Sequence, residues 1–176
     1  MCFMDLSRAF DTINIDILLE KLNTYGVRGL ANDWFRSYLN GRSQFIEINS
    51  KRSKNKCNIL HGVPQGSILG PLLFTLYIND FWKCLDFAEA IMFADDTTLV
   101  FKDKDIDLLI AKVNEDLSSA ENWFAENKLS LNIKKTKYML FDKSRSRNRD
   151  FEVYICNKVL ERVKSKKFLV LHLMKS

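Results

Sequence analysis

The sequence predicts an α+β fold in which helices cover one face of a mostly antiparallel sheet, and three observations predict it. Short strand-like runs alternate with longer segments whose apolar residues recur at helical spacing. Two polar segments, 50–55 and 95–96, are each flanked by apolar runs, which is typical of hairpins between antiparallel strands. The 176 residues are enough to bury one sizeable core and do not require two independent domains.

The first third of the chain predicts a strand, two helices and a hairpin. MCFMDL at the N-terminus is typical of a short strand, whose apolar run is interrupted by Asp5. Apolar residues at helical spacing predict one helix that ends at Gly26 and a second that follows Gly29. Segments 43–49 and 55–60 are the predicted arms of a hairpin, joined by the basic turn SKRSKN. The helix-defining residues are Ile13, Ile17, Leu18, Leu22 and Tyr25, then Leu30, Trp34, Phe35, Tyr38 and Leu39.

The middle of the chain contains one conformationally special loop. Both prolines and three of the six glycines fall within residues 62–71, which marks an unusual backbone path there. PLLFTLYINDFW follows, apolar nearly all round, and predicts a buried helix. Segments 88–94 and 97–101 flank Asp95 and Asp96 as two predicted strands.

The last third predicts a long helix and more strands. The clearest amphipathic helix is followed by a strand at 138–141, a basic loop at 143–149, a hairpin at 151–163 and a last strand at 167–173. This order fits a split βαβ, ferredoxin-like sheet. The helix is defined by Ile106, Leu109, Ile110, Val113, Leu117, Ala120 and Phe124.

Three aspartates are candidates for a metal site. In a split βαβ sheet the first strand can lie beside the later hairpin, which would bring Asp5 to Asp95 and Asp96. Because successive strand residues point to opposite faces, the two neighbouring aspartates face one cation only if the backbone turns between them. Such a cluster would hold one or two Mg²⁺ ions and support phosphoryl transfer. The alternative is that Asp95 and Asp96 form a solvated hairpin tip.

Composition excludes some classes and leaves the partner open. The net charge of +5 fits a polyanionic partner or an ordinary basic surface. No apolar run is long enough to span a bilayer, and the N-terminus does not resemble a signal peptide. The four scattered cysteines lack zinc-site spacing, so we expect reduced and mostly buried thiols in an intracellular protein.

Four segments resemble a known family. MDLSRAFDTI, GVPQGSILGPLLF, FADDTTLV and NKLSLNIKKTKYMLF occur in the order of reverse transcriptase sequence blocks, and are most similar to those of non-LTR (LINE-like) retrotransposons. The resemblance implies the palm of an RNA-directed DNA polymerase that uses Mg²⁺, or Mn²⁺, with an RNA template, a DNA primer and deoxynucleotides. It implies that Asp5 and Asp95 are metal ligands and that Asp96 is the second aspartate of the catalytic hairpin.

The resemblance also implies roles for residues outside the carboxylates. Phe10 matches a ring that excludes a 2′-hydroxyl, although a plain core phenylalanine is an equal alternative. The neighbouring Asp11 is expected to cap the following helix. Lys135 matches a lysine that protonates the leaving pyrophosphate or holds the triphosphate, and Lys134 and Lys137 are alternatives for that position. The competing interpretation for each of the three is a solvated lysine cluster. The block against the nascent base pair and template is matched by Gly62, Pro64, Gln65, Gly66 and Ser67, which also suit a tight helix-entry loop.

The match departs from the family in places. Residues 41–61 are expected to be a fingers-like hairpin insertion and residues 150–176 a primer-grip-like region, but Val170 and Met174 stand where the family usually carries Gly and Asp. We expect a palm fragment that lacks most of the fingers and the thumb, with exposed apolar surface that favours self-association. Two alternatives to the polymerase are a non-catalytic relic that binds nucleic acid and an RNA-dependent RNA polymerase palm, against which Phe10 argues.

Overall fold

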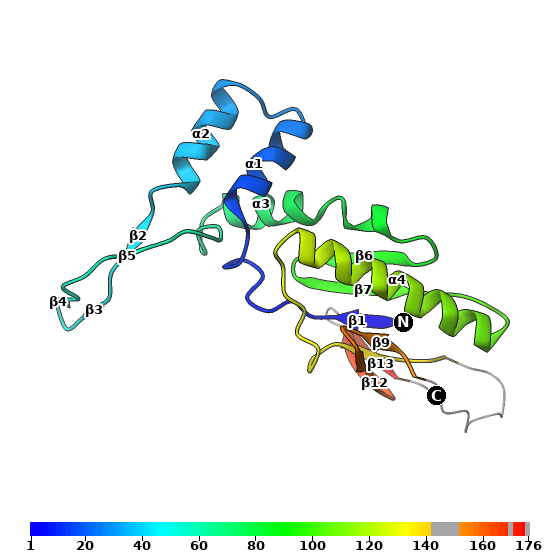
Figure 1. Ribbon diagram of the computed structural model, residues 1–176. Helices are drawn as coiled ribbons and strands as arrows, with labels where there is room; N and C mark the ends of the chain where they lie inside the picture. The colour runs from blue at the N-terminus through cyan, green and yellow to red at the C-terminus, as the bar shows by residue number, and fades with distance from the viewer. Residues whose placement is uncertain (142–151, 169–170, 175–176) are drawn as a thin grey trace. The chain divides into compact units, whose positions relative to one another are not determined.

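The computed structural model describes residues 1–141, 152–168 and 171–174 (Figure 1). The chain divides into two compact units, and each is described by itself. The first unit combines Met1–Ser7 with Asp80–Ser176, and the second is Arg8–Asn79. The N-terminal strand therefore belongs with the second half of the chain.

A five-stranded sheet forms the centre of the first unit. Its order is β11 (Glu161–Arg162), β8 (Lys137–Tyr138), β1 (Cys2–Met4), β7 (Asp96–Val100) and β6 (Glu89–Phe93). Every neighbouring pair is antiparallel except β11 with β8. The structure thus confirms the mostly antiparallel sheet and the prediction that the first strand lies beside the hairpin.

Helix α4 (Ile106–Glu126) supplies much of the core of this unit. The side chain of Asp105 caps its N-terminus by accepting hydrogen bonds from the next turn. The buried positions of the helix recur at spacings of three and four, as the sequence predicts. They are Val113, Asp116, Leu117, Ala120, Trp123 and Phe124. Phe124 and Trp123 pack on Phe81 of the short helix η1 (Phe81–Cys84), with ring centroids 5.0 and 5.2 Å apart.

A buried carboxylate ties α4 to the strand that enters the hairpin. Asp116 is 1% exposed, and its two oxygens accept hydrogen bonds from the backbone amides of Asp86, Phe87 and Ala88. Three such donors compensate for burying a carboxylate. The amphipathic pattern of the helix did not predict this contact. It predicts apolar residues on the buried face, and Asp116 is a charged residue on that face.

The remaining strands of the first unit form two small hairpins. β9 (Tyr154–Ile155) pairs with β10 (Lys158–Val159), and β12 (Ser165–Phe168) pairs with β13 (Leu171–Met174). The prediction of one last strand over 167–173 is therefore wrong, because the chain reverses within that segment. The expected basic loop at 143–149 and the position of Val170 lie outside the described residues.

The second unit contains three helices. α1 (Ile15–Thr24) packs against both α2 (Leu30–Leu39) and α3 (Leu69–Ile78). Asn14 caps α1, since its side-chain oxygen accepts a hydrogen bond from the amide of Ile17 at 3.1 Å. The expectation that Asp11 caps this helix is wrong, because the helix begins one turn later.

The basic hairpin of the second unit is built in two short steps. β2 (Ser43–Gln44) pairs with β5 (Cys57–Asn58), and β3 (Glu47–Ile48) pairs with β4 (Lys51–Arg52). The turn lies at Asn49 and Ser50, whose φ angles of 49° and 60° suit a two-residue hairpin turn. The predicted hairpin is confirmed, but its turn is shorter than the expected 50–55 segment because β4 occupies part of it.

Two predictions about burial are wrong. α3 is buried on one face only, since Ile68 just before it is 96% exposed and Leu72 is 53% exposed. Of the four free cysteines, only Cys2 is buried, whereas Cys57 is exposed and the other two are half-buried.

No described helix has the length and apolar character needed to cross a membrane.

Candidate active site

The FADD segment forms the tip of the β6–β7 hairpin. Phe93 pairs with Asp96, so the turn consists of Ala94 and Asp95. Ala94 has a φ of 51°, a left-handed conformation that is unfavourable for a residue with a Cβ. Asp95 therefore lies in the turn and Asp96 begins β7, and both side chains are exposed.

Asp5 lies beside this hairpin on the neighbouring strand. Met4↔Thr97 is the last pair of the β1–β7 ladder, and continuing the same register by one residue would set Asp5 opposite Asp96. Residues directly opposite each other share a face of the sheet. The same alternation puts Phe93 on this face, which we call the carboxylate face and define by Asp5, Phe93 and Asp96.

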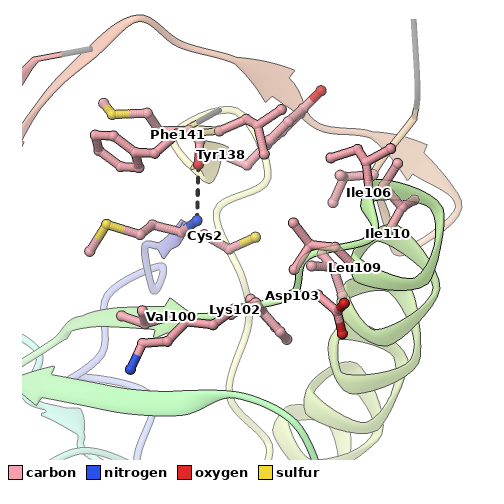
Figure 2. Close-up of a pocket in the computed structure, with 15 residues that line it drawn as sticks. Cys2, Val100, Lys102, Asp103, Ile106, Leu109, Ile110, Tyr138 and Phe141 are labelled. Atoms are coloured by element: carbon pink, nitrogen blue, oxygen red, sulfur yellow. Dashed lines mark hydrogen bonds between the residues drawn. The ribbon is translucent and has the colours of Figure 1, made fainter. Parts of the chain in front are cut away.

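The opposite face of the sheet is the one that α4 covers. A cavity of about 350 Å³ lies there and is lined by side chains from the sheet and from the first half of α4. Figure 2 shows Cys2 and Tyr138 from the strands opposite Ile106 and Ile110 of the helix. Because Cys2 and Asp5 are separated by an odd number of positions on one extended segment, this apolar cavity is not part of the carboxylate face.

Segment 130–136 holds the end of β1 in place. The amide of Asn132 donates to the carbonyl of Asp5 at 2.8 Å, and the amide of Asp5 donates to the hydroxyl of Thr136 at 3.4 Å. Thr136 is fully buried, and its hydroxyl donates in turn to the carbonyl of Asn132 at 3.0 Å. Leu6 forms an isolated bridge with Leu131. The backbone on both sides of the Asp5 side chain is therefore fixed.

The two lysines nearest this segment have different partners. The Lys135 ammonium lies 3.7 Å from Oδ2 of Asp5. The Lys137 ammonium forms an ion pair with Glu161 on the adjacent strand. Of the three lysines considered from the sequence, Lys135 is thus the one whose ion pair, within the described residues, involves Asp5.

The carboxylates have the chemistry of a divalent-cation site. Oδ2 of Asp5 is buried and has no hydrogen-bond partner, although a buried carboxylate oxygen normally has one. Within the part of the chain that the structure describes, no three side chains of His, Cys, Asp or Glu converge as a metal cluster. Mg²⁺ typically uses only one or two protein carboxylates and completes its shell with water and substrate phosphates. The donor set therefore fits Mg²⁺, while the sharing of one site by all three aspartates stays a prediction.

The loop at residues 62–71 belongs to the second unit, and its backbone path requires a glycine at Gly62. Its amide donates to the carbonyl of Ile13 at 2.8 Å, and its φ is 79°. A Cβ at this position would lie 2.8 Å from backbone atoms of Phe10 and Asp11. The close approach that requires glycine is therefore made by the segment 10–11 of the same chain. Arg42 also fixes this loop, because its guanidinium donates to the carbonyls of His61 and Gly62.

Gln65 is oriented by Asp11. Its side-chain amide donates to Oδ1 of Asp11 at 2.6 Å. A carboxylate accepts but does not donate, so the amide oxygen of Gln65 points away from Asp11. Both residues line a cavity of about 530 Å³ with Arg42 and His61. The structure thus gives Asp11 a contact that the sequence did not reveal.

The rest of the loop leads into α3. The hydroxyl of Ser67 donates to the carbonyl of Pro64 at 2.7 Å and accepts from the amide of Gly70 at 2.9 Å. Gly66 has a φ of 80°, with open space where a Cβ would lie. These contacts confirm the tight helix-entry loop, whereas the template-contacting roles of Gly62, Pro64, Gln65, Gly66 and Ser67 stay predictions.

Phe10 packs against the core of the second unit. Its ring packs on Phe74 at a centroid distance of 4.7 Å, and Phe74 is fully buried. Phe10 itself is half-buried. The ring is anchored as a core side chain would be, and its role against a 2′-hydroxyl stays a prediction.

The sheet of the first unit has the strand order of a known class of protein. It has the split βαβ strand order, with Asp5 directly after the first strand and Asp95 in the turn of the adjacent hairpin. This is the arrangement expected from the resemblance to a polymerase palm. The family description "Reverse transcriptase (RNA-dependent DNA polymerase)" matches residues 1–173. The chain belongs to the reverse transcriptase family.

Several relatives come from mobile elements of insects. A probable RNA-directed DNA polymerase from transposon BS of Drosophila melanogaster is 28% identical over 147 residues, which cover 76% of this chain and 15% of the relative. An RNA-directed DNA polymerase from mobile element jockey of Drosophila funebris is 29% identical over 150 residues, or 80% of this chain and 16% of the relative. This chain therefore spans less than a fifth of the length of these two relatives.

A solved structure supports the fold. An apo telomerase from Candida tropicalis, truncated from its C-terminal domain, superposes with a TM-score of 0.66 at 14% sequence identity. The match covers 98% of this chain and 33% of the telomerase chain. At this identity the likeness concerns the fold alone, and it agrees with a palm fragment.

Proposed function

We propose that this chain is the palm segment of a non-LTR retrotransposon reverse transcriptase, which adds deoxynucleotides to a DNA primer on an RNA template. The observation that carries the proposal is that Met4, the neighbour of Asp5, pairs with Thr97, the neighbour of Asp96, while Asp95 lies in the adjoining turn. In the whole polymerase, residues 41–61 would belong to the fingers and residues 150–176 to the primer grip. The four free thiols fit a reducing, intracellular setting.

The three aspartates are the proposed metal ligands. Asp5, Asp95 and Asp96 would hold two Mg²⁺ ions, with Mn²⁺ as an alternative, and the orphaned Oδ2 of Asp5 supports this assignment. When bound, such a metal pair would activate the primer 3′-hydroxyl and stabilise the leaving oxygen. The sheet and segment 130–136 contribute by holding the backbone of Asp5 rigidly beside the hairpin.

Other residues serve the nucleotide and the leaving group. The primer 3′-hydroxyl would lose its proton to water as its oxygen forms a bond to the α-phosphorus of the deoxynucleotide and the bond to pyrophosphate breaks. Lys135 would donate a proton to the leaving pyrophosphate. Phe10, anchored on Phe74, would exclude a ribonucleotide by contact with its 2′-hydroxyl. Gln65 would contact the nascent base pair and template through the amide oxygen that Asp11 does not engage.

Primer extension tests the proposal directly. The chain is given an RNA template, a DNA primer, deoxynucleotides and Mg²⁺, and is compared with its Asp95→Asn variant. We expect extension by the unaltered chain and none by the variant. Glu89→Gln, which neutralises an exposed carboxylate at the far end of the same hairpin, is the matched control and should extend normally. Full activity of Asp95→Asn would refute the metal assignment.

Two outcomes would favour other functions. Preferential incorporation of ribonucleotides would indicate an RNA-dependent RNA polymerase palm. Nucleic-acid binding that survives replacement of all three aspartates, without nucleotide addition in Mg²⁺ or Mn²⁺, would indicate a non-catalytic relic. The net charge of +5 is the observation that favours nucleic-acid binding by such a relic.

A further inference from the structure

The ammonium of Lys135 lies close to the one carboxylate oxygen that lacks a hydrogen bond. Nζ of Lys135 and Oδ2 of Asp5 are 3.7 Å apart, which is longer than a hydrogen bond and within the range of an ion pair. The Asp5 side chain is 27% exposed and the Lys135 side chain 68% exposed. The carboxylate is thus fixed and partly shielded, whereas the ammonium is free to move into water.

Backbone hydrogen bonds keep the two residues together. The amide of Lys135 donates to the carbonyl of Asn132 at 3.0 Å, and the amide of Asn132 donates to the carbonyl of Asp5 at 2.8 Å. The Lys135 ammonium is therefore tethered near Asp5 and has a high effective concentration there. Lys137 cannot take this place, because Glu161 holds its ammonium.

We infer that Lys135 competes with a divalent cation for the carboxylate of Asp5, and thereby weakens and tunes metal binding. The inference rests on the proposed metal site. Two positive charges cannot both occupy the space beside Oδ2, so binding of the cation requires the ammonium to leave. The lysine proposed to serve the pyrophosphate would then be released toward the substrate by the same event that loads the metal.

Removing the charge of Lys135 should strengthen metal binding. We expect Lys135→Gln to lower the dissociation constant for Mn²⁺ by about two- to tenfold at low ionic strength. The difference should shrink as salt is added, because ions screen exposed charges. Lys135→Arg keeps the charge, and its dissociation constant should stay within about twofold of the unaltered chain.

The experiment is a titration of the chain with Mn²⁺, in which electron paramagnetic resonance measures the free ion. It needs no nucleotide addition, so it reads the metal site separately from activity. Lys134→Gln is the matched control, since it removes the same charge from the next exposed position and Lys134 has no ion pair to any residue that the structure describes. Asp5→Asn defines which bound Mn²⁺ belongs to the site, and circular dichroism checks that every variant is folded.

The outcomes separate the inference from the proposed function. Tighter binding by Lys135→Gln than by Lys134→Gln, together with loss of the site in Asp5→Asn, supports the competition. Equal binding by the two lysine variants overturns the competition while Asp5 remains a metal ligand. Unchanged Mn²⁺ binding in Asp5→Asn overturns the proposed metal site and the inference with it.

Discussion

The backbone amide of Asp5 donates to the hydroxyl of Thr136, a residue that lies 131 positions later in the chain. This contact joins the first strand to the segment that carries Lys135. It links the two parts of the sequence whose motifs were recognised separately, and it shows how the fold places a carboxylate and a cation at one end of a sheet.

Replacement of Thr136 by valine should destabilise the first unit. The change keeps the shape of the side chain but removes the hydroxyl, which is fully buried and also donates to the carbonyl of Asn132. We expect the free energy of unfolding to fall by about 1–2 kcal/mol, because a partly buried amide and a carbonyl lose a partner. Urea denaturation measures the loss. Thr136→Ser restores the hydroxyl and should recover most of the stability, so an equally unstable serine variant would contradict the role of this hydrogen bond.

Gly62 should tolerate alanine much less well than Gly66. Both have left-handed φ angles, but only at Gly62 would a Cβ collide with backbone atoms, at 2.8 Å. We expect Gly62→Ala to lower the free energy of unfolding by about 2–5 kcal/mol, because strain and overpacking add. Gly66→Ala should cost only about 1–2 kcal/mol, from backbone strain alone. Equal losses in denaturant titrations of the two variants would show that the close approach at Gly62 is not important.

Ala94 is a position where glycine should stabilise the protein. The residue holds a φ of 51° at the tip of the β6–β7 hairpin, and glycine adopts that conformation without a Cβ clash. We expect Ala94→Gly to raise the free energy of unfolding by about 0.5–1 kcal/mol, after allowance for the greater freedom of glycine in the unfolded chain. Thermal unfolding checks this expectation. A loss of stability would mean that contacts of the Ala94 methyl group outweigh the strain.

Stability at alkaline pH should depend on Cys2. Burial raises the pKa of the Cys2 thiol from 9.0 to about 11. A pKa that is higher in the folded than in the unfolded chain means that stability is complete below pH 9.0 and falls as the pH rises toward about 11. The loss should approach about 3 kcal/mol. Cys2→Ala removes this titration, so its free energy of unfolding should fall less over the same range, and parallel curves for the two proteins would contradict the expectation.

Local pattern was enough to predict the main helices and the central strands. α4 is predicted by apolar residues at helical spacing, and the order of the elements predicts that β1 lies beside β7. The predictions from the sequence were wrong where one pattern of apolar residues is compatible with two different structures. A run of apolar residues at 167–173 is equally typical of one strand and of two that reverse, and the burial of α3 depends on neighbours that are distant in the sequence.

The sequence motifs name the candidate residues, but they do not predict the contacts that these residues make. The motifs identify Asp5, the hairpin aspartates and Lys135, and they do not show that Lys135 rather than Lys137 pairs with Asp5. The contact between Asp11 and Gln65 was missed because Asp11 before a helix resembles a cap. Long-range hydrogen bonds of this kind leave no periodic signal, since each involves one side chain and a partner far along the chain.

The rate of a single deoxynucleotide addition is the most direct test of the central claim, which is that Asp5 and the hairpin aspartates form one metal-dependent site. The unaltered chain and Asp5→Asn are compared on the same RNA template and DNA primer in Mg²⁺, with binding of the template–primer measured in parallel. We expect the rate to be lower by on the order of 100-fold or more in Asp5→Asn, with binding unchanged. An unreduced rate in a folded Asp5→Asn variant would contradict it.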